Sequence, residues 1–167
     1  MKKNKKINIM GKDRTVLNMC SKTGHFNADQ AYRLNKTTEQ RLNKLTDGGF
    51  LIKHATKDGF VYTLDKNGKA LCTDIYHTAG YNHDLKMTEE YLKFKNEYDF
   101  KTGYSFCKER DIDYRNSPDM VLVHKVTGEV KTIEVITPNY KDIEIQQKLE
   151  FAEIHNVEIQ LVYANKY

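Results

Sequence analysis

The chain has 167 residues and a net charge of +4, from 27 Lys and Arg against 23 Asp and Glu. Its length allows one or two small domains, and its three cysteines have neither a Cys-x-x-Cys spacing nor a histidine at zinc spacing. A structural zinc site is therefore not expected, whereas reduced thiols in a cytoplasm are. The basic residues at positions 2–6 are followed by no apolar stretch, so we expect neither a secretory signal nor a membrane anchor.

Positive charge is concentrated in the first half of the chain. Residues 1–76 hold 15 Lys and Arg against 7 Asp and Glu, whereas residues 77–167 hold 12 against 16. A basic part suits a polyanion and an acidic part suits cations, so the change in charge favours two domains. Four segments are expected: a basic disordered arm at 1–11, a first domain at 12–76, a junction at 77–82 and a second domain at 83–167.

Apolar spacing in the first domain predicts three helices followed by two strands. The expected elements are helices at 13–22, 27–34 and 37–47, strands at 50–55 and 60–64, and a last helix at 65–75. Thr37 and Gln40 have the spacing of a capping box, which places Thr37 at the start of the third helix. A Gly-Gly pair closes that helix, and an Asp-Gly pair marks a tight turn between the strands.

Three helices followed by a basic hairpin resemble a winged helix-turn-helix domain, especially over residues 41–72. In that family the third helix enters the major groove of DNA and the wing reaches phosphate or the minor groove. The resemblance implies seven DNA-binding residues, four on the outer face of the third helix and three on the wing: Thr37, Gln40, Arg41, Lys44, Lys53, His54 and Lys57. Some winged helices contact protein instead, and the local positive charge favours double-stranded DNA here.

Residues 116–137, NSPDMVLVHKVTGEVKTIEVIT, form the most informative segment of the chain. Two β-branched apolar runs around a Thr-Gly pair predict a β-hairpin that turns between Val126 and Thr127. This register places Asp119 opposite Glu134. Two adjacent carboxylates are what a catalytic Mg²⁺ requires from a protein.

Helical and strand periods around the hairpin predict an α-β-β-β-α-β order. The elements are a helix at 84–98, a strand at 104–110, hairpin strands at 120–126 and 129–136, a helix at 141–155 and a strand at 157–163. The last strand follows a crossover helix, so we expect it to run parallel to the second hairpin strand. The whole chain is therefore expected to have an α+β fold.

This order, together with the Pro118-Asp119 pair and Glu134, resembles the PD-(D/E)xK restriction-endonuclease-like fold. The resemblance implies a bound Mg²⁺ or Mn²⁺ whose protein ligands are Asp119, Glu134 and a carboxylate from the preceding helix. Glu90 is the candidate for that third ligand, with Glu89 as the open alternative. The implied function is metal-dependent cleavage of DNA.

The lysine of the motif, expected two residues after Glu134, is replaced by Ile136. Glu129 and Lys131 also form a Glu-x-Lys run, but it lies beside the turn. Glu129 is roughly 17 Å along the strand from Glu134, which is too far to share a metal ion with Asp119. Lys141, early in the following helix, is the expected substitute. His83, at the start of the linking helix, is a further catalytic candidate.

The combination of a winged helix and a nuclease-like core resembles the replication-relaxation family over residues 12–163. That family includes the relaxases of conjugative and mobilisable elements. The resemblance implies DNA processing, mobilisation or replication at a specific duplex site of a plasmid, phage or conjugative element. Other mobilisation or replication proteins are the implied protein partners, and no membrane is involved.

The sequence leaves three classes of function open: an active metal-dependent nickase, a DNA-binding accessory protein with an inactive core, and an interaction protein that inhibits a host enzyme. Ile136 and the short chain favour the second class. An aromatic set suits either a homodimer interface or packing on the sheet: Tyr81, Tyr91, Phe94 and Tyr98.

Overall fold

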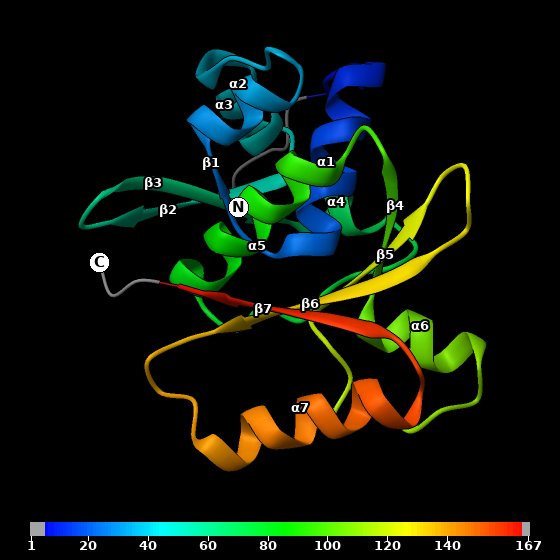
Figure 1. Ribbon diagram of the computed structural model, residues 1–167. Helices are drawn as coiled ribbons and strands as arrows, with labels where there is room; N and C mark the ends of the chain where they lie inside the picture. The colour runs from blue at the N-terminus through cyan, green and yellow to red at the C-terminus, as the bar shows by residue number, and fades with distance from the viewer. Residues whose placement is uncertain (1–5, 165–167) are drawn as a thin grey trace. The chain divides into compact units, whose positions relative to one another are not determined.

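The computed structural model describes residues 6–164 (Figure 1). The described chain is mixed α+β, with seven helices and two β-sheets, which confirms the expected fold class. It divides into two compact units on either side of Leu92. The division falls within helix α5 (Tyr81–Phe94), later than the expected junction at 77–82. Residues 1–5 of the expected basic arm lie outside the described part.

The first unit has the element order α1-β1-α2-α3-β2-β3, followed by α4 and most of α5. The bounds are α1 Gly11–Thr23, β1 Phe26–Asn27, α2 Ala28–Asn35, α3 Glu39–Asp47, β2 Leu51–Thr56, β3 Gly59–Leu64 and α4 Lys66–Lys69. The three strands are antiparallel, with β3 between β1 and β2. Helices α1 to α3 and strands β2 and β3 agree with the expected bounds to within two residues. The short strand β1 was not expected, and α4 ends well before residue 75.

Apolar side chains from the helices and the sheet form the core of the first unit. Leu17 on α1 and Leu42 and Leu45 on α3 are buried, and Phe26 stacks on Tyr62 with ring centroids 5.5 Å apart. Burial of each such side chain stabilises the fold by about 1.5–3 kcal/mol. The inward positions of α3 are therefore fixed by packing, which leaves its other face for contacts outside the core.

The first part of α5 is tied to the first unit by hydrogen bonds. Thr88 Oγ1 donates to the His25 carbonyl at 2.7 Å, and Gln30 Nε2 donates to the Leu85 carbonyl at 3.0 Å. These bonds connect α5 with residues near β1 and α2. They explain why the linking helix, expected to begin the second domain, belongs mostly to the first unit.

The second unit contains a four-stranded sheet in the order β4-β5-β6-β7. Its elements are β4 Tyr98–Thr102, α6 Gly103–Glu109, β5 Met120–His124, β6 Val130–Ile136, α7 Asp142–Ile154 and β7 Glu158–Tyr163. Strands β4, β5 and β6 are antiparallel, and β7 is parallel to β6, which confirms the expected crossover. Helices α6 and α7 lie on the same side of this sheet (Figure 1), where Phe106, Cys107, Val121 and Phe151 pack together.

The strand expected at 104–110 is wrong, because these residues belong to helix α6 and the strand that pairs with β5 is β4. Thr102 Oγ1 accepts a hydrogen bond from the Ser105 N–H and caps the helix. Glycine is required at position 103, because a Cβ there would lie 1.9 Å from the Pro118 carbonyl oxygen. The chain therefore enters a helix directly after β4.

Candidate functional site

Asp119 and Glu134 lie beside each other where the hairpin strands begin and end. Met120 pairs with Ile133, and the same register continued by one residue sets Asp119 opposite Glu134, as expected. The Asp119 N–H donates to Glu134 Oε2 at 3.0 Å, and the Val135 N–H donates to Asp119 Oδ2 at 2.8 Å. Each carboxylate thus accepts a backbone hydrogen bond from the other strand, which holds the pair in place.

Glu134 is completely buried and has two further side-chain partners. The Tyr140 hydroxyl donates to its Oε1 at 2.5 Å, and Lys148 Nζ lies 3.0 Å from the same oxygen. Burial and the charge of Asp119 raise the pKa of Glu134 to about 7, although Lys148 and Tyr140 act in the opposite direction. The buried carboxylate therefore has a high affinity for a proton or another cation.

Lys148 was missed in the sequence, and it is the lysine that the structure brings to the carboxylate pair. It extends from α7, and its Nζ also donates to the Ser117 carbonyl at 2.6 Å. Lys141, the expected substitute, is the exposed N-cap residue of α7 and contacts Glu144 through its backbone N–H. Seven residues of helix separate the two lysines by about 10 Å along the axis. Lys148 thus supplies the positive charge beside Glu134.

His83, Glu89 and Glu90 have partners within the first unit. His83 is buried with Nδ1 3.1 Å from Asp84 Oδ1. Glu89 accepts two hydrogen bonds from the Arg33 guanidinium, each 2.9 Å long. Glu90 is buried with its Oε1 3.5 Å from the Nζ of the lysine four residues earlier. These contacts give each side chain a role within the fold; a catalytic role for His83 and metal binding by Glu90 stay predictions.

A metal ion at the candidate site would have two protein carboxylates, those of Asp119 and Glu134. Across residues 6–164 no group of three or more His, Cys, Asp or Glu side chains is placed to hold a metal ion. Mg²⁺ often binds to one or two carboxylates and keeps several of its waters. The raised proton affinity of Glu134 beside Asp119 fits such an ion, since a cation between the carboxylates relieves their repulsion.

The four DNA-binding candidates at α3 differ in exposure. Gln40 and Lys44 are exposed, as expected for the outer face. Thr37 is buried, and its hydroxyl donates to Asn35 Oδ1 at 2.6 Å, so its expected position on the outer face is wrong. Thr38, not Thr37, caps the helix. The one-residue shift of the cap turns Thr37 inward.

Arg41 is half-buried and bound to α1. Its Nε and Nη2 donate to the two carboxylate oxygens of Asp13 at 2.9 and 2.5 Å, and Nη2 also donates to the Asn8 carbonyl. Burial opposes ionisation of Asp13, but the hydrogen bonds from Arg41 and the Met10 N–H leave its pKa lowered. The guanidinium group therefore joins α3 to α1, which is a structural role.

Replacement of Arg41 by Ala should destabilise the protein. Asp13 would remain buried without its partner, and loss of one member of such a pair costs about 2 kcal/mol or more. We expect a lower midpoint of thermal unfolding for Arg41→Ala than for Lys44→Ala, an exposed control on the same helix. Equal midpoints for the two variants would contradict this role.

The wing candidates are arranged around the β2–β3 hairpin. Lys53 Nζ lies 4.0 Å from the centre of the Phe60 ring and donates to Glu39 Oε1 at 3.1 Å. The ring of His54 is hydrogen-bonded to Thr63 at 2.8 Å, and burial together with the charge of a neighbouring histidine lowers its pKa. Lys57 is exposed in the turn. Of the three, Lys57 is the most accessible to a ligand.

The aromatic residues expected at a dimer interface do not form one exposed surface. Tyr91 and Tyr98 are buried, and the ring of Tyr98 meets Phe94 and His124 edge-on at 5.7 and 5.0 Å. These contacts favour the alternative that the rings pack within the chain. A homodimer stays a prediction.

Comparison of the chain with protein-family models, curated proteins and solved structures found no match. In the part of the chain that the structure describes, no helix is long and apolar enough to cross a membrane. The candidate site is therefore defined by its own geometry, a buried glutamate beside an aspartate on the adjacent strand and a lysine from the following helix.

Proposed function

We propose that this chain binds duplex DNA through its first unit and hydrolyses a phosphodiester bond of DNA in its second unit, as a DNA-processing protein of a mobile element. The observation that carries the proposal is the position of Lys148, whose Nζ lies 3.0 Å from Glu134 Oε1. It supplies the charge that Ile136 does not. Lys148 therefore favours an active core, whereas the sequence alone favours an inactive one.

The arrangement of Asp119, Glu134 and Lys148 suits phosphodiester hydrolysis. A divalent ion bound to the two carboxylates would act as a Lewis acid and lower the pKa of a bound water. Lys148 is placed to stabilise negative charge that develops on a phosphate next to the pair. The Tyr140 hydroxyl fixes the Glu134 carboxylate by hydrogen bonding to the oxygen that Lys148 also approaches.

The topology of the second unit supports a nuclease-like assignment. Helix α5, which lies mostly in the first unit, is followed in the chain by β4, β5, β6, α7 and β7 of the second unit. This is the order expected for a PD-(D/E)xK-like core, with α6 as one additional helix between the first two strands. Asp119 directly precedes β5 and Glu134 lies on β6, and these are the two central strands of the sheet. The lysine comes from the crossover helix α7. Both central strands are held by neighbours on each side, which keeps the pair rigid.

The element order of the first unit supports a winged helix-turn-helix. Helix α3 presents Gln40 and Lys44 to solvent, and the turn between β2 and β3 presents Lys57. Each phosphate that a lysine neutralises releases counterions, so affinity for DNA should fall steeply with salt. The proposal assigns non-specific phosphate contacts to the two lysines and a base contact to Gln40.

Removal of Lys44 and Lys57 together should weaken binding of the full chain to duplex DNA and make the salt dependence shallower by about two counterions. Fluorescence anisotropy at several salt concentrations measures both quantities. Lys108→Ala, which removes an exposed charge from α6, is the matched control and should have little effect. An unchanged salt slope in the double variant would contradict DNA binding through this face.

The test of the catalytic proposal is the conversion of supercoiled plasmid to the open-circular form by the full chain. We expect conversion with Mg²⁺ or Mn²⁺ and none with EDTA, because the carboxylate pair needs a cation to bind phosphate. DNA binding without conversion at any metal concentration would contradict catalysis. The remaining function would then be that of a DNA-binding accessory protein.

A further inference from the structure

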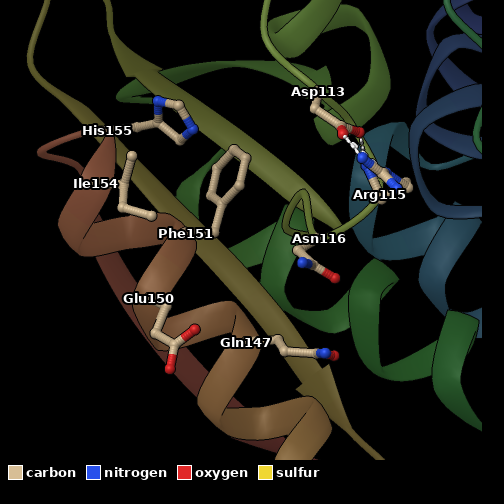
Figure 2. A pocket seen from close by; sticks show the side chains of 8 residues that line it. All are labelled: Asp113, Arg115, Asn116, Gln147, Glu150, Phe151, Ile154 and His155. Atoms are coloured by element: carbon tan, nitrogen blue, oxygen red, sulfur yellow. Dashed lines mark hydrogen bonds and ion pairs between the residues drawn. The ribbon is translucent and has the colours of Figure 1, made fainter.

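A cavity of about 510 Å³ lies in the second unit, between α7 and the loop that precedes β5 (Figure 2). Its volume is in the range of pockets that bind small ligands or single groups of larger ones. Its lining includes Gln147 and Glu150 from α7, His155 directly after that helix, and Arg115 and Asn116 from the loop. No part of the proposed chemistry uses these residues.

Two residues that line the cavity are adjacent in sequence to residues at the candidate site, one in the loop before β5 and one on α7. Asn116 precedes Ser117, and Gln147 precedes Lys148. Lys148 Nζ donates to the Ser117 carbonyl at 2.6 Å, so one hydrogen bond joins the two segments that form the walls. Consecutive Cα atoms are about 3.8 Å apart, so the base next to a phosphate held at Lys148 is within reach of these walls.

The side chains of the cavity suit a base better than a phosphate. Within residues 6–164 the amides of Asn116 and Gln147 have no protein hydrogen-bond partner, so both can donate to and accept from a ligand. His155 packs against Phe151 with ring centroids 4.5 Å apart, and such rings are surfaces on which bases stack. The carboxylate of Glu150 opposes entry of a phosphate and can accept from an amino group.

Arg115 is held at the edge of the cavity by Asp113. Its Nε donates to Asp113 Oδ2 at 2.7 Å, and Nη2 bonds to the same oxygen (Figure 2). Because Asp113 neutralises the guanidinium group, Arg115 adds little net charge to attract phosphate. Its plane remains available to stack on a base.

We infer that this cavity receives one unpaired base of the DNA strand whose phosphate lies at the Asp119–Glu134–Lys148 site. The location of the strand rests on the proposed function, whereas the affinity for a base rests on the cavity alone. A base held in this way must leave the duplex stack, so single-stranded or distorted DNA is the substrate class that the site favours.

The test compares two dye-labelled hexanucleotides, one with six bases and one with the same backbone but no bases, by anisotropy with the full chain in EDTA. Phosphate contacts are the same for both, so the ratio of their dissociation constants reports contacts with bases. We expect the wild-type protein to favour the hexanucleotide with bases by about tenfold. The Asn116→Ala/Gln147→Ala variant should have a clearly smaller preference, because it loses the amide hydrogen bonds and keeps only the stacking surfaces.

Gln160→Ala is the matched control, because Gln160 is an exposed amide on β7 that does not line the cavity. It should keep the tenfold preference. An undiminished preference in the double variant, or no preference in the wild type, would overturn the assignment. Displacement of the hexanucleotide by free deoxyadenosine monophosphate at an equal concentration would also overturn it, in favour of a free-nucleotide site.

The two proposals fail separately. Loss of plasmid conversion with the base preference intact contradicts the proposed catalysis and supports the cavity assignment. Plasmid conversion without any base preference supports the proposed catalysis and contradicts the cavity assignment. The three substituted amides are exposed, and an unchanged midpoint of thermal unfolding confirms that each variant is folded.

Discussion

Lys148→Met should lower the rate of metal-dependent DNA nicking by a factor of about 100 or more while the protein stays folded. Removal of one group that stabilises transition-state charge typically has an effect of this size. The substitution also removes a charge that lowers the pKa of Glu134, so a larger fraction of this carboxyl group would be protonated near neutral pH. Lys148→Arg should retain part of the activity.

Lys141→Met is the control, since it removes the same charge from the same helix at a position that does not contact Glu134. Its rate should remain within about twofold of wild type, on the reasoning that exposed charges away from a site have small effects. Single-turnover nicking of supercoiled plasmid measures both variants. A large loss for Lys141→Met with a normal rate for Lys148→Met would reverse the assignment of the two lysines.

Glu134→Gln should raise the free energy of unfolding at pH 8 while it abolishes nicking. The pKa of Glu134 is about 7 in the folded protein, above the value of about 4.3 for an unfolded chain. The folded state therefore binds more protons between these values, and its stability falls as the pH rises through this window. Above pH 7 the ionised carboxylate lowers the free energy of unfolding by on the order of 3 kcal/mol. A neutral amide has no such effect.

Denaturant unfolding at pH 5 and pH 8 measures this effect. The advantage of Glu134→Gln over wild type should be large at pH 8 and small at pH 5. Added Mg²⁺ should stabilise wild type and leave Glu134→Gln unchanged, because the cation replaces the proton. Glu153→Gln, an exposed control on α7, should follow wild type. If Glu134→Gln also follows wild type at both pH values, the ionised Glu134 carboxylate does not destabilise the folded protein.

The hairpin of the second unit could be predicted because its signals are local. A single turn signal between two β-branched runs fixes the register, and the register alone brings Asp119 opposite Glu134. The parallel arrangement of β7 follows from the handedness and length of a crossover connection. These features depend on residues close together in sequence, so they can be predicted from it.

Helix α6 and the capping of α3 show where local signals compete. Alternation of Tyr104 and Phe106 favoured a strand, whereas Thr102 and Gly103 form a helix start that the alternation concealed. At α3, Thr37 and Thr38 both suit an N-cap, and the choice between them depends on what Thr37 packs against. Adjacent candidates of equal propensity are decided by tertiary contacts.

The contacts of Lys148 and Arg41 were not predicted, because their partners are distant in sequence. Lys148 lies three residues before Phe151, on the inward face of α7, and a lysine on an inward face indicates a buried partner. That signal was available, although it does not name Glu134. Arg41 and Asp13 are separated by 28 residues, and no periodicity predicts their contact.

The most direct test of the account is the single-turnover rate of plasmid nicking by Asp119→Asn with Mg²⁺. Asparagine keeps the shape of the side chain and its acceptor for the Val135 N–H but removes the charge beside Glu134. We expect the rate to fall by about 1,000-fold, with DNA binding and the midpoint of thermal unfolding near their wild-type values. Nicking by Asp119→Asn at the wild-type rate would place the chemistry elsewhere in the protein and contradict the account.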